Sequence, residues 1–481
     1  MRLQVVFRYI GMVLLFESAF MLLSAFVSYA NGIDSGFTPL LLSFLLTALL
    51  GSFPLIFVGK SNRLSSKESY AIVIGAWLTS CVVGTFPYLL WGGEFSVINA
   101  WFESVSGFTT TGASILNNIE ALPKGLLFWR QLTTWIGGVG VVMFALVIMP
   151  MMGRSRMTVS NLEISSMARD NYRYTSSTII KILMGIYLGI TIANTLAFKL
   201  AGMDWFDAVC HSFSNIATGG FSTKNASIGF YNNVWIEIVS IFFMFLASIH
   251  LGIIYATIAG RRNNIFRNEG ARFYIFTTLA LCLILSLSLW GNGTYATIGE
   301  SLRHGFFQGV SIVTSTGFAT ADTTVWPALC VCILIYMSIQ GGMAGSTAGG
   351  LKSDRILMTG KVIRAQLKQQ QHPGAIIRIK SNGNVQESSI VHFAILYIVI
   401  YIFIILLGTF INALCGLDTM TSFTASVSSM GNIGPGFGAV GSLDNYSAMP
   451  IVVKCVCTLQ MLLGRLEIFG LLHFFTMRWW V

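Results

Sequence analysis

Long apolar stretches alternate with short polar ones along the whole chain. A helix needs about 20 predominantly apolar residues to cross roughly 30 Å of hydrocarbon. Stretches of this kind lie at residues 5–30, 37–59, 69–91, 126–152, 177–200, 232–259, 272–290, 324–350, 388–414 and 448–477. Only 10% of the residues are charged, whereas a soluble domain carries roughly 25%. The pattern therefore predicts an all-α integral membrane protein with ten spans.

Four shorter segments lie between pairs of predicted spans and are too short and too polar to cross. Their positions are residues 96–108, 204–216, 300–313 and 419–430. Re-entrant or irregular backbone is tolerated at membrane depth only where protein buries it or water lines it. We therefore expect these segments to enter the membrane and return to the same side, as around a pore. Their polar residues, such as Glu103, His211 and His304, serve a structural role or orient the pore.

Lys and Arg residues gather at alternate ends of the predicted spans. The formal net charge is +10. The basic stretches are Arg2 with Arg8, Lys60 to Lys67, Arg154 to Lys181, Arg261 to Arg272, Lys352 to Lys380, and Arg478. By the positive-inside rule these stretches face the cytoplasm, which predicts two cytoplasmic termini and re-entry of the four short segments. Nucleic-acid binding would explain the charge but not its regular spacing, so no nucleic-acid partner is expected.

The four short segments form an internal repeat. Three align without gaps: WFESVSGFTTTG ending at Gly112, FFQGVSIVTSTG ending at Gly317, and FTASVSSMGNIG ending at Gly434. The remaining copy, HSFSNIATGGFST, aligns with a one-residue shift that makes Gly219 the equivalent glycine. Such periodicity marks a repeated structural unit. The predicted domains are a two-helix leader, 1–68, and four units of outer helix, pore helix, glycine loop and inner helix at 69–174, 175–270, 271–386 and 387–481.

The glycine loops have the chemistry of a potassium filter. Rings of backbone carbonyls replace the hydration shell of K⁺ in channels, and glycine permits the backbone angles and close approach that such rings need. The negative end of each pore-helix dipole would favour a cation. Glycines that merely allow close helix packing are the alternative. The predicted potassium-binding residues, and the only expected metal site, are Thr110, Thr111, Gly112, Ala217, Thr218, Gly219, Ser315, Thr316, Gly317, Asn432, Ile433 and Gly434.

The motifs SGFTTTGAS, NIATGGFST, TSTGFATAD and GNIGPGFG resemble those of the Trk/Ktr/HKT superfamily of cation transporters. The resemblance covers essentially the whole chain, and the two leading helices are most similar to the TrkH branch. It implies a bacterial cytoplasmic (inner) membrane protein and a homodimer with one pore per subunit. It also implies a cytosolic nucleotide-binding regulatory protein of the TrkA type, docked on the basic loops. Membrane topology and contact with anionic lipid are a second explanation of those loops.

A glycine-rich segment predicts a break in the third inner helix. The sequence GGMAGSTAGGLKSDR runs from Gly341 to Arg355, and each glycine weakens a helix by about 1 kcal/mol. A tight packing site for a neighbouring helix is the alternative. The resemblance to the TrkH branch implies an intramembrane loop that obstructs the cytoplasmic side of the pore. It assigns this gating role to Gly345, Ser346, Thr347, Gly349 and Gly350.

Arg465 lies far from either end of the last predicted span. A buried arginine costs a few kcal/mol or more in a membrane, so it faces a cavity or a partner. We expect Arg465 to face the pore, where its charge repels cations or holds the loop shut; the TrkH branch has an arginine at a similar position. A structural pair with a carboxylate or with backbone carbonyls is the alternative. Glu467 is two residues away and does not share its helix face.

These patterns together predict potassium uptake through a selective, gated pore. Each inward cation gains about 2.3 kcal/mol per 100 mV of inside-negative potential. A sodium-permeable pore or a sodium-coupled symporter of the same fold is the first alternative, although Gly112 argues for potassium because sodium-selective plant relatives have serine there. An alternating-access carrier would typically have inverted repeats. The sequence contains no convincing catalytic group set or Walker-type loop, so neither enzymatic activity nor a covalently bound cofactor is expected.

Overall fold

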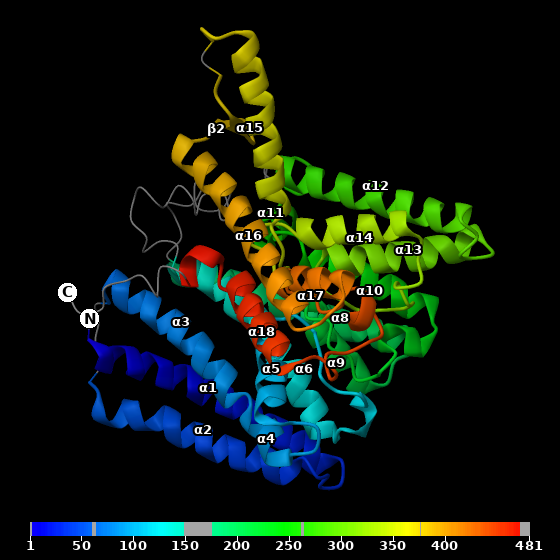
Figure 1. The fold of residues 1–481 in the computed structure, drawn as a ribbon. Coiled ribbons are helices and arrows are strands. Elements are labelled where there is room, and N and C mark those ends of the chain that lie inside the picture. The colour runs from blue at the N-terminus through cyan, green and yellow to red at the C-terminus, as the bar shows by residue number, and fades with distance from the viewer. Residues whose placement is uncertain (1, 60–63, 149–175, 261–263, 376, 472–481) are drawn as a thin grey trace.

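The computed structural model describes residues 2–59, 64–148, 176–260, 264–375 and 377–471, and it confirms the predicted all-α architecture (Figure 1). Six of the described helices are long and apolar enough to cross a membrane, or seven if one bent pair is a single span. Parts of five basic stretches, including residues 154–175 and Arg478, lie outside the described residues. The only described strands, β1 (Lys380–Ser381) and β2 (Asn384–Val385), form an antiparallel hairpin.

The two leading helices, α1 (Leu3–Ala30) and α2 (Phe37–Phe57), pack against each other along their length (Figure 1). Gly11 of α1 faces Gly51 of α2 in this contact. A Cβ atom on Gly51 would lie 2.8 Å from the Gly11 carbonyl oxygen and 3.0 Å from the Leu15 nitrogen. Small residues of this kind let membrane helices pack backbone to backbone. The leader also contacts α3 and α6 of the first unit.

After the leader, the elements fall into four units of the same order. The first contains α3 (Ser66–Val83), α4 (Phe86–Trp91), α5 (Val97–Phe108) and α6 (Lys124–Ile148). The second contains α8 (Ser176–Leu200), α9 (Trp205–Ile216), α10 (Val234–Ala247) and α11 (Leu251–Ile258). The third contains α12 (Glu269–Gly291), α13 (Ile298–Val313), α14 (Ala328–Gln340) and α15 (Ser353–Gln371). The fourth contains α16 (Ser388–Leu414), α17 (Thr419–Gly431) and α18 (Ile451–Arg465).

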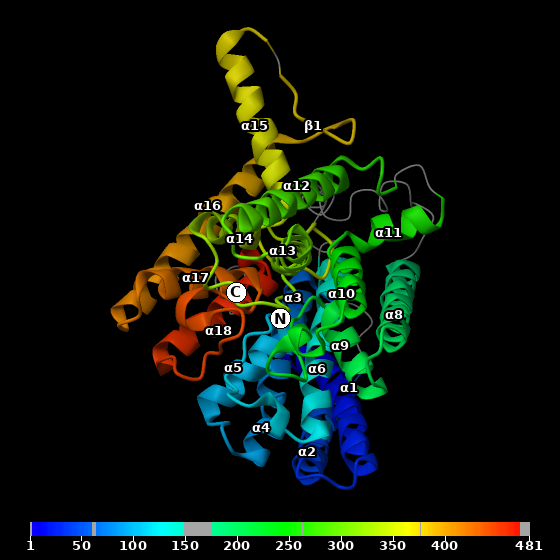
Figure 2. The same ribbon diagram turned by 90° about the vertical axis from the view of Figure 1, so that its right-hand side faces the viewer.

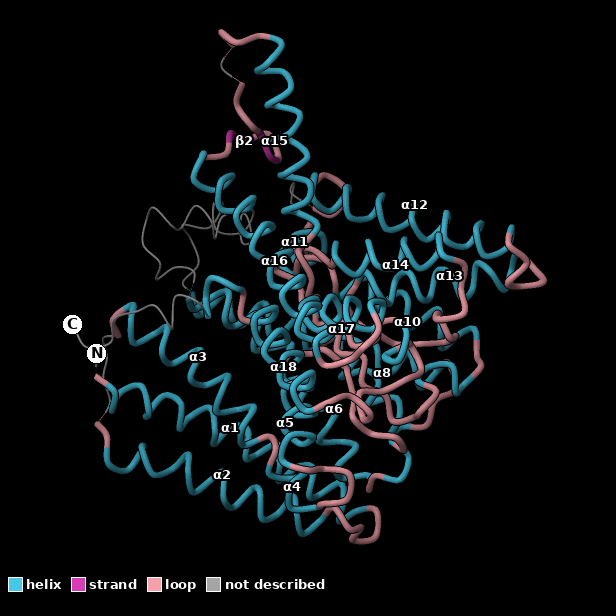
Figure 3. Tube along the Cα trace, viewed as in Figure 1, coloured by secondary structure: helices cyan, strands magenta, loops and turns pink. Residues whose placement is uncertain are grey.

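The predicted short segments are the helices α5, α9, α13 and α17. Three of them begin at a side-chain cap: Ser96 accepts from the Asn99 amide, Thr297 from Glu300, and Asp418 from Thr421. Such caps satisfy amide groups that the first helical turn leaves without a partner. Figure 3 shows the non-helical segments that follow these helices gathered near the centre of the molecule.

Three of the predicted inner spans are not continuous helices. The break in the third was predicted from its glycines, whereas the breaks in the second and fourth correct the sequence-based boundaries. The span at 232–259 is broken between α10 and α11, which meet at an angle of 101°. The span at 324–350 contains the short helix α14 and then leaves helical geometry at Gly341. In the last span, the helix α18 ends at Arg465. Two residues later, Glu467 has a positive φ of 56°. Hydropathy gives the length of an apolar run but not the point where its backbone turns.

A test of the leader packing is the variant Gly51→Leu. The added side chain overlaps the backbone of α1, and overpacking of this kind destabilises by about 1–3 kcal/mol. We expect a lower unfolding temperature in detergent, measured by fluorescence-detected size exclusion after heating. The matched control is Gly185→Leu in α8, because among the described residues no atom of another element lies within 4 Å of a Cβ at Gly185. Equal unfolding temperatures for the two variants would contradict the close α1–α2 contact.

Candidate functional site

All four pore helices end in the same turn. The residue that leaves each helix is left-handed: φ is 51° at Thr110, 54° at Thr218, 55° at Ser315 and 51° at Asn432. The next amide donates to the carbonyl of a serine five residues earlier. These bonds are Thr111 to Ser106 at 2.8 Å, Gly219 to Ser214 at 2.8 Å, Thr316 to Ser311 at 2.9 Å, and Ile433 to Ser428 at 3.0 Å. This is the Schellman end of a helix, and it gives the four loops one common register.

This register corrects the sequence alignment of the second loop. A glycine with positive φ follows two residues after each left-handed residue: Gly112 at 81°, Gly220 at 69°, Gly317 at 79° and Gly434 at 100°. The predicted equivalence of Gly219 is therefore wrong by one position. Gly219 corresponds to Thr111, and Ala217 corresponds to Thr109. The second loop aligns with the others without a one-residue shift when the loops are compared by the hydrogen bonds that end each pore helix. The Thr-Gly pair, on which the sequence alignment rested, does not mark equivalent positions.

The four loops meet in a ring. A Cβ atom on each loop glycine would overlap a carbonyl oxygen of the next loop. The pairs are Gly112 with Gly219, Gly220 with Thr316, Gly317 with Ile433, and Gly434 with Thr111. The cycle passes through the units in order and closes on the first, so the loops converge on one axis. Side chains at these glycines would separate the loops.

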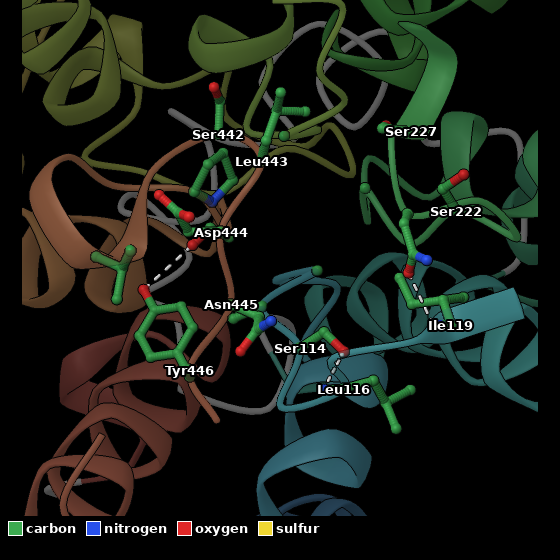
Figure 4. A pocket seen from close by; sticks show the side chains of 18 of the residues that line it. Ser114, Leu116, Ile119, Ser222, Ser227, Ser442, Leu443, Asp444, Asn445 and Tyr446 are labelled. Atoms are coloured by element: carbon green, nitrogen blue, oxygen red, sulfur yellow. Dashed lines mark hydrogen bonds between the residues drawn. The ribbon is translucent and has the colours of Figure 1, made fainter. Parts of the chain in front are cut away.

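A pocket of about 110 Å³ lies over this ring, and all four glycines line it. Figure 4 shows the segments that return from the first, second and fourth loops on its sides, with Ser114, Ser222 and Tyr446 among them. The Tyr446 hydroxyl donates to the Gly434 carbonyl over 3.2 Å. Asp444 lines the pocket, as does Lys224. Asp322, which follows the third loop, accepts the Thr324 amide at 2.9 Å.

On the opposite side of the ring, the glycine-rich segment forms a loop against the ends of the pore helices. The Gly349 amide donates to Ser315 Oγ at 2.5 Å, and a Cβ on Gly349 would overlap the Gly431 carbonyl. Thr347 Oγ1 donates to the Ile216 carbonyl over 3.0 Å. The loop therefore touches the pore-helix ends of the second, third and fourth units.

The same loop docks on the break in the second inner helix, a contact that sequence reasoning missed. The Met343 amide donates to the Ser248 carbonyl at 3.0 Å, and the Leu251 amide donates to the Gly345 carbonyl at 3.3 Å. Thr347 Oγ1 reaches the Ala247 carbonyl at 3.1 Å. A helix break exposes carbonyls that need new partners. His250, which accepts the Gly252 amide at the start of α11, is the sequence signal for this break.

Two of the predicted gate residues are glycines in a left-handed backbone conformation. Gly345 and Gly350 have φ of 76° and 80°, which favour glycine. Ser346 and Thr347 are buried, and the Ser346 hydroxyl donates to the Met343 carbonyl over 2.6 Å. Asp354 fixes the loop by accepting the Ala344 amide at 2.8 Å. The segment is not helical, and the close approach of Gly349 to the Gly431 carbonyl of α17 shows that it also packs tightly against a neighbouring helix.

Arg465 ties the loop to two inner helices. Its side chain is buried; Nη1 donates to the Thr347 carbonyl at 2.6 Å and Nη2 to the Gly137 carbonyl at 3.3 Å. The alternative predicted from the sequence, in which Arg465 pairs with backbone carbonyls, therefore describes its contacts. These contacts join α18, the loop and α6. Glu467 instead pairs with Arg355 at 2.7 Å.

Removal of the Arg465 guanidinium tests this arrangement. In Arg465→Gln we expect faster hydrogen exchange of the amides at 343–349, because the loop loses its bond to α18. Lys454→Gln is the control, since Lys454 lies on the same helix but bonds to Asn99 and Ser447 at the other end. Exchange in the loop that is unchanged, or equally faster in both variants, would contradict the anchoring role.

Comparison with known proteins agrees with this geometry. The family model TrkH, described as a cation transport protein, matches residues 40–478. The potassium uptake protein TrkH of the Trk system of Escherichia coli K12 is 33% identical, and the alignment covers all of both chains. TrkG of the same strain is 32% identical over 87% of this chain and 86% of its own.

A solved structure has the same fold. The crystal structure of the potassium transporter TrkH from Vibrio parahaemolyticus superimposes with a TM-score of 0.90 and 31% sequence identity, covering all of both chains. This chain therefore resembles these proteins over its full length, both in sequence and in fold. The chain belongs to the TrkH family of cation transport proteins.

Proposed function

We propose that this protein takes up potassium through a pore whose selectivity filter is the ring of four glycine loops. The observation that carries the proposal is the packing of each loop glycine against a carbonyl oxygen of the next loop. Oxygens gathered in this way can replace the water around K⁺. The relatives named as potassium uptake proteins support the choice of ion.

The proposed filter keeps the residues chosen from sequence and adds the glycine that the structure makes equivalent. Its conducting positions are Thr110 to Gly112, Thr218 to Gly220, Ser315 to Gly317, and Asn432 to Gly434, with Ala217 at the base of the second loop. The four pore helices end beside these residues, and the partial negative charge of their carboxyl ends favours a cation there. K⁺ is the transported substrate, and an inside-negative membrane potential drives it inward.

We further propose that residues 341–352 are the gate. The loop lies against the pore-helix ends, Arg465 holds it there, and it continues directly into α15. Figures 1 and 2 show α15 projecting away from the other helices, with the β1–β2 hairpin beside it. A partner that binds this projection could pull the loop. The proposed partner is a cytosolic nucleotide-binding protein of the TrkA type, and the names of the relatives as parts of a Trk system support it. The proposed assembly is a homodimer in the bacterial inner membrane with both termini in the cytoplasm.

A sodium-permeable pore of the same fold is the second candidate. The structure gives each loop a glycine at the ring position, including Gly112 in the first loop. Sodium-selective plant relatives carry serine in that loop, so four glycines favour potassium. Competition between the two ions in one flux assay distinguishes these functions.

Substitution of a ring glycine tests the filter. Positive φ costs a residue with a Cβ about 1–2 kcal/mol, and the Cβ in Gly317→Ser also overlaps the Ile433 carbonyl. A free-energy difference of about 1.4 kcal/mol corresponds to a tenfold change in an equilibrium constant. We therefore expect the discrimination of K⁺ over Na⁺, measured by flux into liposomes, to fall by about tenfold. Gly185→Ser, in an open position of α8, is the control. Unchanged selectivity in a folded Gly317→Ser protein would refute the filter assignment.

Release of the loop tests the gate. In cells unable to take up potassium by other routes, we expect Arg465→Gln to raise rubidium uptake several-fold without a regulator, because the loop loses its anchor. Co-expression of a TrkA-type regulator should raise uptake by the wild type more than by the variant. Lys454→Gln should behave as the wild type. Equal uptake by wild type and Arg465→Gln, at matched membrane expression, would show that the loop does not limit flux.

A further inference from the structure

A buried ion pair lies behind the first two filter loops. Arg130 of the inner helix α6 donates from Nε to Glu103 Oε1 of the pore helix α5 over 2.6 Å, and their side chains are 1% and 0% exposed. A buried ion pair requires excellent geometry and further hydrogen bonds to offset its desolvation. The partners that provide these bonds show what the pair does.

Those partners are the segments that leave the filter. Glu103 accepts the Ser114 hydroxyl at 3.0 Å and the Ile115 amide at 3.0 Å, both just beyond Gly112. Arg130 Nη1 donates to the Ser222 carbonyl at 2.9 Å, just beyond Gly220. Ser114 and Ser222 occupy the same position of their loops. The ion pair therefore joins the first loop to the second.

The Arg130 guanidinium also stacks on the second loop. Its central carbon lies 3.5 Å from the centre of the Phe221 ring, and Phe221 directly follows Gly220. Arginine combines stacking with a planar set of donors, whereas lysine offers one compact ammonium group. Arg130 thus holds the second loop by a carbonyl and a ring while it holds the first loop through Glu103.

Within the part of the chain that the structure describes, the equivalent positions of the other three units make different contacts. The common register places His211, Gln308 and Ala425 at the position of Glu103. His211 Nε2 pairs with the Ser222 hydroxyl at 2.9 Å, and Gln308 Nε2 donates to the Ala321 carbonyl at 2.8 Å. In the fourth unit Thr424 instead accepts the Phe437 amide at 2.9 Å. These three side chains hold segments of their own loops, whereas Glu103 and Arg130 bridge two units.

We propose that Glu103 and Arg130 are positioning residues that set the spacing of the first and second filter loops and thereby the discrimination of K⁺ from Na⁺. The inference rests on the proposed potassium filter, which it deepens. Neither side chain is placed in contact with the ion. They act through the backbone beyond Gly112 and Gly220, and a site of this kind must be held to within about 0.5 Å.

The variant Arg130→Lys tests the proposal. Lysine retains the charge opposite Glu103 but not the simultaneous bond to the Ser222 carbonyl and stacking on Phe221. In proteoliposomes we expect potassium flux to continue while the ratio of potassium to sodium permeability falls by about tenfold. A wild-type ratio in Arg130→Lys would overturn the positioning role while leaving the proposed filter intact. Absence of potassium flux in the wild type would instead refute the proposed function.

Arg303→Lys is the matched control. Arg303 of the pore helix α13 pairs with Glu237 of the inner helix α10 at 2.7 Å, and its Nη2 also donates to Asn232. This pair likewise joins two units, but its partners lie outside the filter loops. We expect the permeability ratio of Arg303→Lys to equal that of the wild type. An equal fall in both variants would assign the effect to general loosening and overturn the proposal.

A double variant separates positioning from stability. Loss of one member of a buried pair leaves an uncompensated charge, whereas replacement of both by apolar residues is often neutral. We therefore expect Glu103→Met to lower the unfolding temperature in detergent and Glu103→Met/Arg130→Met to recover part of the loss. The double variant should remain poorly selective, since the loops stay unlinked. Recovery of selectivity together with stability would overturn the proposal.

Discussion

The structure depends on one contact made four times, between a glycine without a side chain and the peptide oxygen of the neighbouring loop. Inside a membrane, backbone groups that leave helical bonding need partners within the protein. The pore helices meet this need with the same Schellman turn, in which a serine carbonyl accepts the amide that follows the left-handed residue. Once that turn is fixed, the following glycine is aimed at the next unit.

The surrounding helices can be understood as support for this ring. Polar side chains of the four pore helices hold the segments that leave the loops, and the buried Glu103 and Arg130 connect two of them. On the other face, residues 341–352 contact the pore-helix ends of the second, third and fourth units at once. Because the four units belong to one chain, each has acquired a different attachment. A ring of identical subunits would carry every attachment in four copies.

Most of the architecture could be predicted from the sequence. The lengths of the apolar stretches indicate the membrane spans, and the internal repeat indicates the four short helices between them. The sequence was also sufficient for the glycine-rich break, since five glycines within 341–350 weaken a helix wherever they occur. The register of the second loop was not accessible in this way. Two adjacent glycines, Gly219 and Gly220, fit the motif equally, and only the bond to Ser214 selects between them. The breaks after Ala247 and Arg465 were missed because apolar composition continues through them.

The bond from the Gly349 amide to Ser315 Oγ has a thermodynamic consequence. Ser315 is the left-handed residue of the third loop, so the conformations of this loop and of residues 341–352 are not independent. Any coupling between two equilibria acts with the same magnitude in both directions. An ion species that changes the backbone around Ser315 therefore changes the free energy of displacing Gly349, and displacement of Gly349 changes the affinity for that ion by the same factor. In the proposed pore, the composition of the permeating solution is thus one of the variables that set how often the proposed gate is open.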